Sequence, residues 1–254
     1  MVPVRLKTLF KHCIQAGVIA SAFLSCLHTQ AQTDGLGSWN IVNFKYNVNS
    51  KWSLFGEAQL RSLLFYNNFH YHEYKGGGTY ILSKNFSITA GVGRYSTYRE
   101  GGNFRTPMAN DELRTWLQVN MTNALGDVQF EHRYRAEQRF TSANGYRNRF
   151  RYRLAVAAPI ARKNNDKIYF SIWNELFLTN EAPYFERNRF FAGIGYEFSQ
   201  NFTWQVGYVN QLDYRINDET GRNFLQTSWL FTFPWKQRKS LLQLKRKLTK
   251  MEGL

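Results

Sequence analysis

Two neighbouring segments of the chain alternate charged and aromatic residues with a period of two. One set of alternate positions holds Glu131, Arg133, Arg135, Glu137 and Arg139 and, after a turn, Arg147, Arg149, Arg151 and Arg153. The positions between them hold Phe130, Tyr134, Phe140, Tyr146, Phe150 and Tyr152. A period of two indicates β-strands rather than helices, and the core of a soluble β-sandwich has no place for such a row of arginines. The pattern predicts a membrane β-barrel, whose apolar face meets lipid and whose charged face lines the lumen.

Segments with this alternation follow one another along most of the chain, separated by turn residues. They run from Trp39 to Tyr46, Trp52 to Phe65, Phe69 to Leu82, Phe86 to Tyr98, Glu112 to Met121, Val128 to Phe140, Tyr146 to Ile160, Lys167 to Leu178, Arg187 to Phe198, Phe202 to Tyr214 and Phe224 to Phe233. Most have the roughly ten residues with which a tilted strand crosses a bilayer. Short connections belong on the periplasmic side of such a barrel and long ones outside the cell.

These segments number eleven, whereas a single-chain bacterial barrel with both termini in the periplasm has an even number of strands. Either one more strand lies within residues 32–38 or 99–111, or the chain before Trp39 passes through the lumen. We therefore predict an all-β fold, a transmembrane antiparallel up-and-down β-barrel of about twelve strands, with ten as the alternative.

The first 31 residues have the order of regions found in a secretory signal peptide. Arg5, Lys7 and Lys11 are followed by an apolar stretch over residues 13–27 and by Thr29-Gln30-Ala31. We predict cleavage after Ala31, with acylation of Cys26 as the alternative. Both cysteines of the chain, Cys13 and Cys26, lie in this segment, so the mature protein would have no thiol, which suits an oxidising compartment.

The barrel is then expected to occupy residues 32–233, and a basic tail residues 234–254. The last predicted strand carries Leu225, Thr227, Trp229, Phe231 and Phe233 on one face. Its aromatic end resembles the terminal signal read by the outer-membrane barrel assembly machinery, although a lipid-facing strand explains the same residues. In the tail, the apolar residues have helical spacing, at Leu241, Leu244, Leu248 and Met251. The tail is expected either to lie on an anionic leaflet as an amphipathic helix or to be disordered in the periplasm.

The composition agrees with alternating lipid-facing and lumen-facing positions. Aromatic residues make up 17% of the chain, yet the mean hydropathy is -0.48. The formal net charge is +15, and nucleic acid is the obvious partner for so basic a chain. We expect no nucleic-acid binding, because the cations recur at strand period rather than in a patch, and because an exported precursor rarely meets nucleic acid.

Short motifs extend over nearly the whole of the expected mature chain. They are residues 52–61, 133–139 and 148–153, Trp173-Asn174-Glu175, Asn188-Arg189 followed by residues 192–196, and Val206-Gly207-Tyr208. Together they resemble the family of bacterial outer-membrane β-barrels known as DUF2490, a domain of unknown function. The resemblance implies a barrel in the cell outer membrane. It implies no activity and no catalytic residue, because none is established for the family.

The charged positions are the main candidates for a functional site. On the inward-facing positions we place Glu57, Arg61, Glu112, Arg114, Glu131, Arg133, Arg135, Glu137, Arg139, Arg147, Arg149, Arg151, Arg153, Glu175, Arg187 and Arg189. The favoured interpretation is structural: carboxylates on one strand bind guanidinium groups on the next and fill a lumen too narrow for bulk water. The functional interpretation is that surplus arginine creates a positive potential that favours anions, phosphates or acidic glycans.

The histidines and glycines suggest three further sites. His70 and His72 are two apart, hence on one face of a strand as a metal pair would be, but no third ligand accompanies them. His132 falls on the lipid-facing side, where a lipid hydrolase could place a general base, yet no serine shares a neighbouring outward position. The glycines at 76–78, 91 and 93 are interpreted as barrel curvature or as room for bulky lumen side chains, because no helix follows them to form a phosphate site.

These observations predict a non-enzymatic outer-membrane β-barrel with a structural role or with a narrow conduit or binding site for anionic solutes. The alternative is an outer-membrane lipid-modifying hydrolase that uses His132. The expected partners are outer-membrane lipids, the barrel assembly machinery and an anionic solute. We expect neither a metal nor another cofactor.

Overall fold

The structure is a computed structural model that describes residues 35–143, 145–163, 166–214 and 220–233. The predicted signal peptide, its cleavage site and the basic tail lie outside the described residues. The described chain forms eleven strands. They are β1 (Leu36–Asn47), β2 (Trp52–Leu64), β3 (Asn67–Ser83), β4 (Phe86–Arg99), β5 (Arg105–Leu125), β6 (Val128–Thr141), β7 (Gly145–Lys163), β8 (Asp166–Thr179), β9 (Phe185–Ser199), β10 (Phe202–Asp213) and β11 (Thr220–Phe233).

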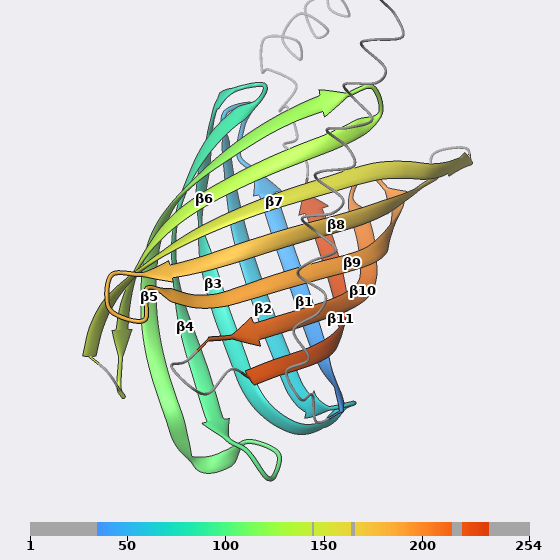
Figure 1. The fold of residues 1–254 in the computed structure, drawn as a ribbon. Coiled ribbons are helices and arrows are strands. Elements are labelled where there is room, and N and C mark those ends of the chain that lie inside the picture. Colours follow the sequence, from blue (N-terminus) through green and yellow to red (C-terminus); the bar gives the residue numbers. More distant parts are fainter. Residues whose placement is uncertain (1–34, 144, 164–165, 215–219, 234–254) are drawn as a thin grey trace, which may run out of the picture. The chain divides into compact units, whose positions relative to one another are not determined.

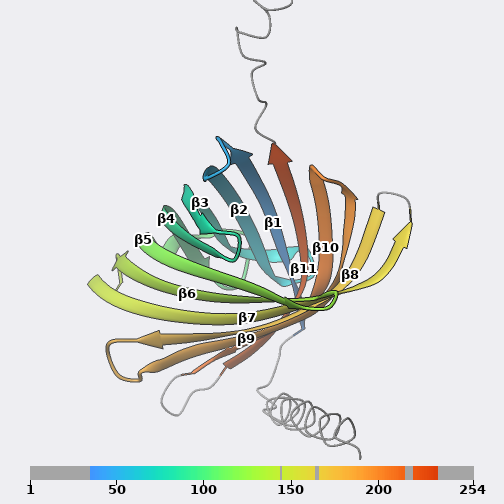
Figure 2. The same cartoon turned by 90° about the horizontal axis from the view of Figure 1, so that it is seen from above.

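Hydrogen bonds close these strands into a barrel, in which each strand pairs with its neighbours in sequence and β1 pairs with β11 (Figures 1 and 2). Consecutive strands are antiparallel, whereas the closing pair of β1 and β11 is parallel. A chain that reverses direction at every turn has its first and last strands in the same direction when their number is odd, so the closing pair has to be parallel. The predicted count of twelve or ten strands is therefore wrong, as is the uniformly antiparallel sheet.

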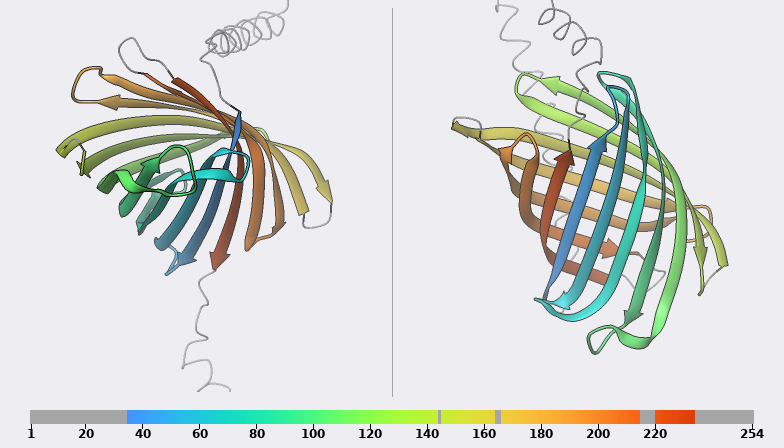
Figure 3. Two further views of the ribbon diagram at one scale, coloured as in Figure 1. Left: turned by 90° about the horizontal axis from the view of Figure 1, so that it is seen from below. Right: turned by 180° about the vertical axis from the view of Figure 1, so that it is seen from behind.

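The segments in which a missing strand was expected lengthen two existing strands instead. Residues 36–38 belong to β1, and residues 105–111 belong to β5. We call the barrel end that carries residues 48–51, 84–85, 126–127 and 200–201 the turn end, and the end that carries residues 65–66, 100–104 and 180–184 the loop end. Because β1 begins at the loop end and β11 finishes at the turn end, the two ends of the barrel chain lie at opposite ends of the barrel (Figure 3).

Glycines on the inner face make room for aromatic rings. A Cβ added to Gly91 would lie 2.3 Å from the indole of Trp116, and one added to Gly77 would lie 2.8 Å from the ring of Phe55. The rings of Phe55 and Trp116 meet inside the lumen, with their centroids 6.4 Å apart. For Gly77 and Gly91, the interpretation as room for bulky lumen side chains is confirmed.

Large apolar side chains are exposed around the outer face. Leu54, Leu117, Phe150 and Ile194 each have about half or more of their surface exposed, and they occupy the positions between the inward-facing residues. Contiguous apolar surface of this extent is rare on soluble monomers. Among the described residues no helix is both long enough and apolar enough to cross a membrane.

Replacing Gly91 by Val should lower the unfolding midpoint of the refolded barrel, because the new side chain would collide with the buried Trp116 ring. Overpacking of this kind costs about 1–3 kcal/mol. Gly56 offers a matched control, since a Cβ added there meets no atom within 4 Å. Urea-induced unfolding of Gly91→Val and Gly56→Val measures the difference, and equal midpoints would contradict the packing of Trp116 on Gly91.

Candidate functional site

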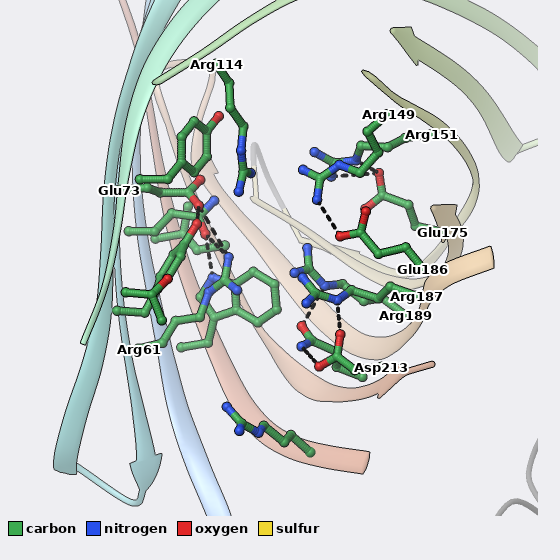
Figure 4. A pocket seen from close by; sticks show the side chains of 18 of the residues that line it. Arg61, Glu73, Arg114, Arg149, Arg151, Glu175, Glu186, Arg187, Arg189 and Asp213 are labelled. Atoms are coloured by element: carbon green, nitrogen blue, oxygen red, sulfur yellow. Dashed lines mark hydrogen bonds and ion pairs between the residues drawn. The ribbon is translucent and has the colours of Figure 1, made fainter. Parts of the chain in front are cut away.

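The lumen contains a cavity of about 1060 Å³. Of the described residues that line it, fourteen are Arg or Lys and seven are Glu or Asp. Figure 4 shows Arg61 on one wall and Arg187 and Arg189 on the opposite wall, with their guanidinium groups directed into the cavity. The lining therefore carries more positive than negative charge.

The two-residue period brings the predicted site residues together on the inner face. Those that line the cavity are Glu57, Arg61, Glu112, Arg114, Arg133, Arg135, Arg139, Arg147, Arg149, Arg151, Arg153, Glu175, Arg187 and Arg189. Glu137 lies behind them and is only 1% exposed. Glu131 is ion-paired with Arg153 at 2.5 Å.

The buried carboxylates each bind more than one guanidinium group. Glu137 lies 2.5 Å from Arg149 and 2.7 Å from Arg151. Glu175 lies 2.5 Å from Arg133 and 2.8 Å from Arg151. Because Arg151 bridges Glu137 on β6 and Glu175 on β8, these pairs form one network across three strands. Breaking a buried ion pair by removing one partner costs about 3–5 kcal/mol, so the network should make this side of the barrel rigid.

Four further charged residues form ion pairs in the lumen although the sequence pattern did not identify them. Glu186 lies 3.0 Å from both Arg139 and Arg149, but it stands just before the predicted strand and so falls in a predicted loop. Glu73 and Lys75, 2.6 Å apart, alternate with aromatic residues in β3, so the period of two could have identified them. Asp213 is ion-paired with Arg187 at the end of β10.

Three buried arginines differ from the others, because each donates to the amide oxygen of a glutamine. The pairs are Arg61 with Gln59 at 2.8 Å, Arg135 with Gln118 at 2.5 Å, and Arg189 with Gln211 at 2.8 Å. We call Arg61, Arg135 and Arg189 the glutamine-bound arginines. Their nearest ion pairs are long, 3.4 Å for Arg61 and 3.5 Å for Arg135, and Arg189 forms none with a described carboxylate. A neutral amide satisfies donors without compensating the positive charge.

Tryptophan rings also lie against the glutamine-bound arginines. The guanidinium carbons of Arg61 and Arg189 are 3.6 Å and 4.9 Å from the centre of the Trp39 ring, and that of Arg135 is 5.1 Å from the Trp116 ring. Cation–π contacts stabilise desolvated guanidinium groups by about 2 kcal/mol or more. They help to hold these arginines in the lumen, but they supply no negative charge.

The structure places His70 and His72 on different faces of β3. His70 lines the cavity, whereas His72 packs against Tyr74 and Tyr98, so the expectation that they share a face is wrong. The reason is a bulge in β3: Arg61 pairs with Tyr71 and Ser62 with Phe69, which leaves His70 as the additional residue. In the described part of the chain no three His, Cys, Asp or Glu side chains are grouped so that they could hold a metal ion.

His132 lies on the outer face and forms a hydrogen bond with the Tyr152 hydroxyl at 2.9 Å. Its neighbours on the adjacent strands are Met121 and Leu154. These partners include neither a serine or cysteine nor a carboxylate that could orient the imidazole for general-base chemistry.

The sequence profile described as "Protein of unknown function (DUF2490)" matches residues 36–222. The chain belongs to the DUF2490 family. No curated protein gives a significant match. Among solved structures, the DUF2490 barrel is similar to LpxR from Salmonella typhimurium, with a TM-score of 0.44 and 7% sequence identity over 70% of this chain and 83% of that chain.

Replacing Arg151 by Glu should lower the unfolding midpoint of this DUF2490 barrel strongly, because it would place three carboxylates together where Arg151 now bridges Glu137 and Glu175. Arg151→Gln should cost less, about 3 kcal/mol, since it breaks the buried pairs without adding a like charge. Arg147→Glu is the control, because Arg147 lies at the loop end and its side chain is 31% exposed. Urea titrations of the three variants test the network, and a similar midpoint for Arg151→Glu and Arg147→Glu would contradict it.

Proposed function

We propose that the protein is a non-enzymatic outer-membrane barrel whose lumen is a narrow binding site or conduit for small anionic solutes. The observation that carries this proposal is the surplus of guanidinium groups around a cavity of about 1060 Å³. The glutamine-bound arginines supply much of that surplus, because they are buried with long ion pairs or, for Arg189, with no ion pair to a described carboxylate. Rings of arginine in a lumen favour anions over cations.

The outer-membrane location is supported by the closed barrel and by the apolar side chains on its outer face. Closure gives the backbone N–H and C=O groups of every strand hydrogen-bond partners, which is the condition for a β-sheet to cross lipid. The signal peptide predicted over residues 1–31 supplies the route of export. Outer-membrane lipids and the barrel assembly machinery are then the expected partners.

A wide pore is not favoured by the way in which the lumen is filled. Glu137 and Glu175 hold Arg149, Arg151 and Arg133 along the wall formed by β6, β7 and β8, and aromatic rings occupy the space over the inner glycines. Side chains fixed in this way leave a narrow path, along which a solute passes from one charged group to the next.

The alternative function, lipid modification by His132, has less support. His132 contacts Tyr152, Met121 and Leu154, and none of these groups can act as a nucleophile for acyl transfer in the way that serine or cysteine does. We therefore favour binding over catalysis.

Planar-bilayer recordings of the refolded barrel should give a small conductance that prefers anions, because of the surplus positive charge in the lumen. Arg135→Gln should reduce the anion preference. Arg94→Gln removes the same charge from the outer face, where the Arg94 side chain is 70% exposed, and should leave the preference unchanged. A preference for cations, or equal effects of the two substitutions, would contradict the proposal.

The protein should fractionate with the outer membrane and migrate differently in gels before and after boiling, as folded barrels resist detergent until heated. The physical reason is the closed hydrogen-bonded sheet. Recovery of the protein from the soluble periplasm, or the same mobility with and without boiling, would rule out an outer-membrane barrel.

A further inference from the structure

Arg61 and Arg189 come from distant strands and converge on Trp39. Arg61 lies on β2 and Arg189 on β9, and their guanidinium carbons are 3.6 Å and 4.9 Å from the centre of the Trp39 ring. The two charges are close enough to interact electrostatically. Figure 4 shows Arg61 and Arg189 reaching into the cavity from opposite walls. Two like charges therefore face one space.

Carboxylates of the described residues compensate this pair of charges only weakly, because Arg61 lies 3.4 Å from Glu73 and Arg189 forms no ion pair with a described carboxylate. Arg61 and Arg189 are each 6% exposed, and each has a glutamine as its closest polar partner. The Nε atom of Arg61 is buried and has no hydrogen-bond partner within the described chain. An oxyanion between the two guanidinium groups would accept charge-assisted hydrogen bonds from both and would remove their mutual repulsion.

Towards the turn end the lining contributed by β1, β8, β10 and β11 is uncharged, whereas Glu57, the register partner of Asn43, carries charge on the neighbouring β2. The lining there includes Asn43, Tyr169, Trp173, Gln205, Gln226 and Ser228. Gln226 is the register partner of Trp39, so this wall adjoins the arginine pair directly. The side chains of Asn43, Gln205, Gln226 and Ser228 form no hydrogen bond with another described residue.

Free amide and hydroxyl groups beside aromatic rings suit a hydroxylated organic molecule. Its hydroxyl groups can exchange hydrogen bonds with the amides, and its C–H faces can pack on Trp173 and Tyr169. The cavity of about 1060 Å³ is far larger than an inorganic anion needs. It matches the upper end of the range of small-molecule sites, roughly 300–1,000 Å³.

We propose that the lumen binds a sugar acid, with its carboxylate between Arg61 and Arg189 and its hydroxylated body against the uncharged wall. The inference rests on the proposed function and narrows its solute from any small anion to a hydroxylated carboxylic acid. Arg61 and Arg189 bind the charged group, while Asn43, Gln205 and Trp173 contact the body.

Calorimetric titration of the refolded barrel with glucuronate, glucose and inorganic phosphate tests both parts of the site. Glucuronate and glucose share the hydroxylated sugar ring and differ in the carboxylate, whereas phosphate carries negative charge but has no such ring. Glucuronate should bind at least tenfold more tightly than either, since a hydrogen bond to a charged group is worth about tenfold or more in affinity. Arg61→Gln and Arg189→Gln should each lower the affinity for glucuronate at least tenfold and leave the affinity for glucose nearly unchanged.

Two comparisons separate this site from the general charge of the lumen. Arg139→Gln removes a lumen arginine that has carboxylate partners. It should lower the affinity for glucuronate less than Arg189→Gln does. Gln205→Ala should lower the affinity for glucuronate without lowering the affinity for phosphate. Equal affinity for glucuronate and glucose would contradict the binding of the carboxylate by Arg61 and Arg189. Equal affinity for glucuronate and phosphate would contradict a contribution of the hydroxylated ring to binding.

The unfolding midpoint supplies a readout that does not depend on the ligand. Arg189→Gln should leave the midpoint at or above that of the wild type, because it removes a charge that forms no ion pair with a described carboxylate. A fall as large as that of Arg151→Gln would assign Arg189 to the structural network and overturn the site. If the barrel prefers anions in bilayers but fails these tests, the sugar-acid site alone is wrong; if it shows no anion preference and binds no anion, the proposed function is wrong as well.

Discussion

A guanidinium group inside a β-barrel has to be compensated where it lies, because bulk water reaches it poorly and the cost of an unpaired buried charge is high. This requirement organises the charged half of the lumen. The backbone register places Glu137 opposite Arg149, with which it is ion-paired. Glu175 is opposite Arg153 and Arg189 in the register, but its side chain forms ion pairs with Arg133 and Arg151. Carboxylates are fewer than arginines, so they are shared between strands rather than paired one to one. The ion pairs consequently fix the relative positions of β6, β7 and β8 from inside, in addition to their backbone hydrogen bonds.

The other half of the lumen is filled by a different means. Gly193 and Gly207 are close to the Phe191 ring, which a Cβ at either position would approach to 2.6 Å. Phe191 in turn stacks on Trp173 with ring centroids 5.3 Å apart. Aromatic rings packed on glycines are uncharged and need no counter-charge. The polar side chains on this wall are therefore not required to compensate charges of the protein itself. The cavity therefore has a charged wall and an uncharged wall, and the two differ in what they can offer to a solute.

The sequence allowed the inner and outer faces to be predicted, because the period of two is a local property of each strand. The pattern places Arg149 and Arg151 on the inner face, and the structure has both there. Properties that depend on the closed sheet were not predictable in this way. The parallel pairing of β1 with β11 follows from the strand count, and the inward position of His70 follows from a one-residue bulge against β2. Glu186 was missed because a charged residue at the very end of a strand has no alternating neighbours on one side.

The glutamines explain why a lumen so rich in ion pairs can still bind an anion. A guanidinium group held by two carboxylates, such as that of Arg151, gives up strong interactions if it turns to a solute. Arg189 has only an amide oxygen and aromatic rings as partners among the described residues, so a solute adds an interaction without displacing one. Gln211 also donates to Asp213 at 2.7 Å, which fixes its amide so that the oxygen faces Arg189. Arg189 is thereby held in place without being neutralised. Since a ligand that binds only the folded state stabilises it by mass action, the bound anion would restore the stability that this unneutralised charge removes from the empty barrel.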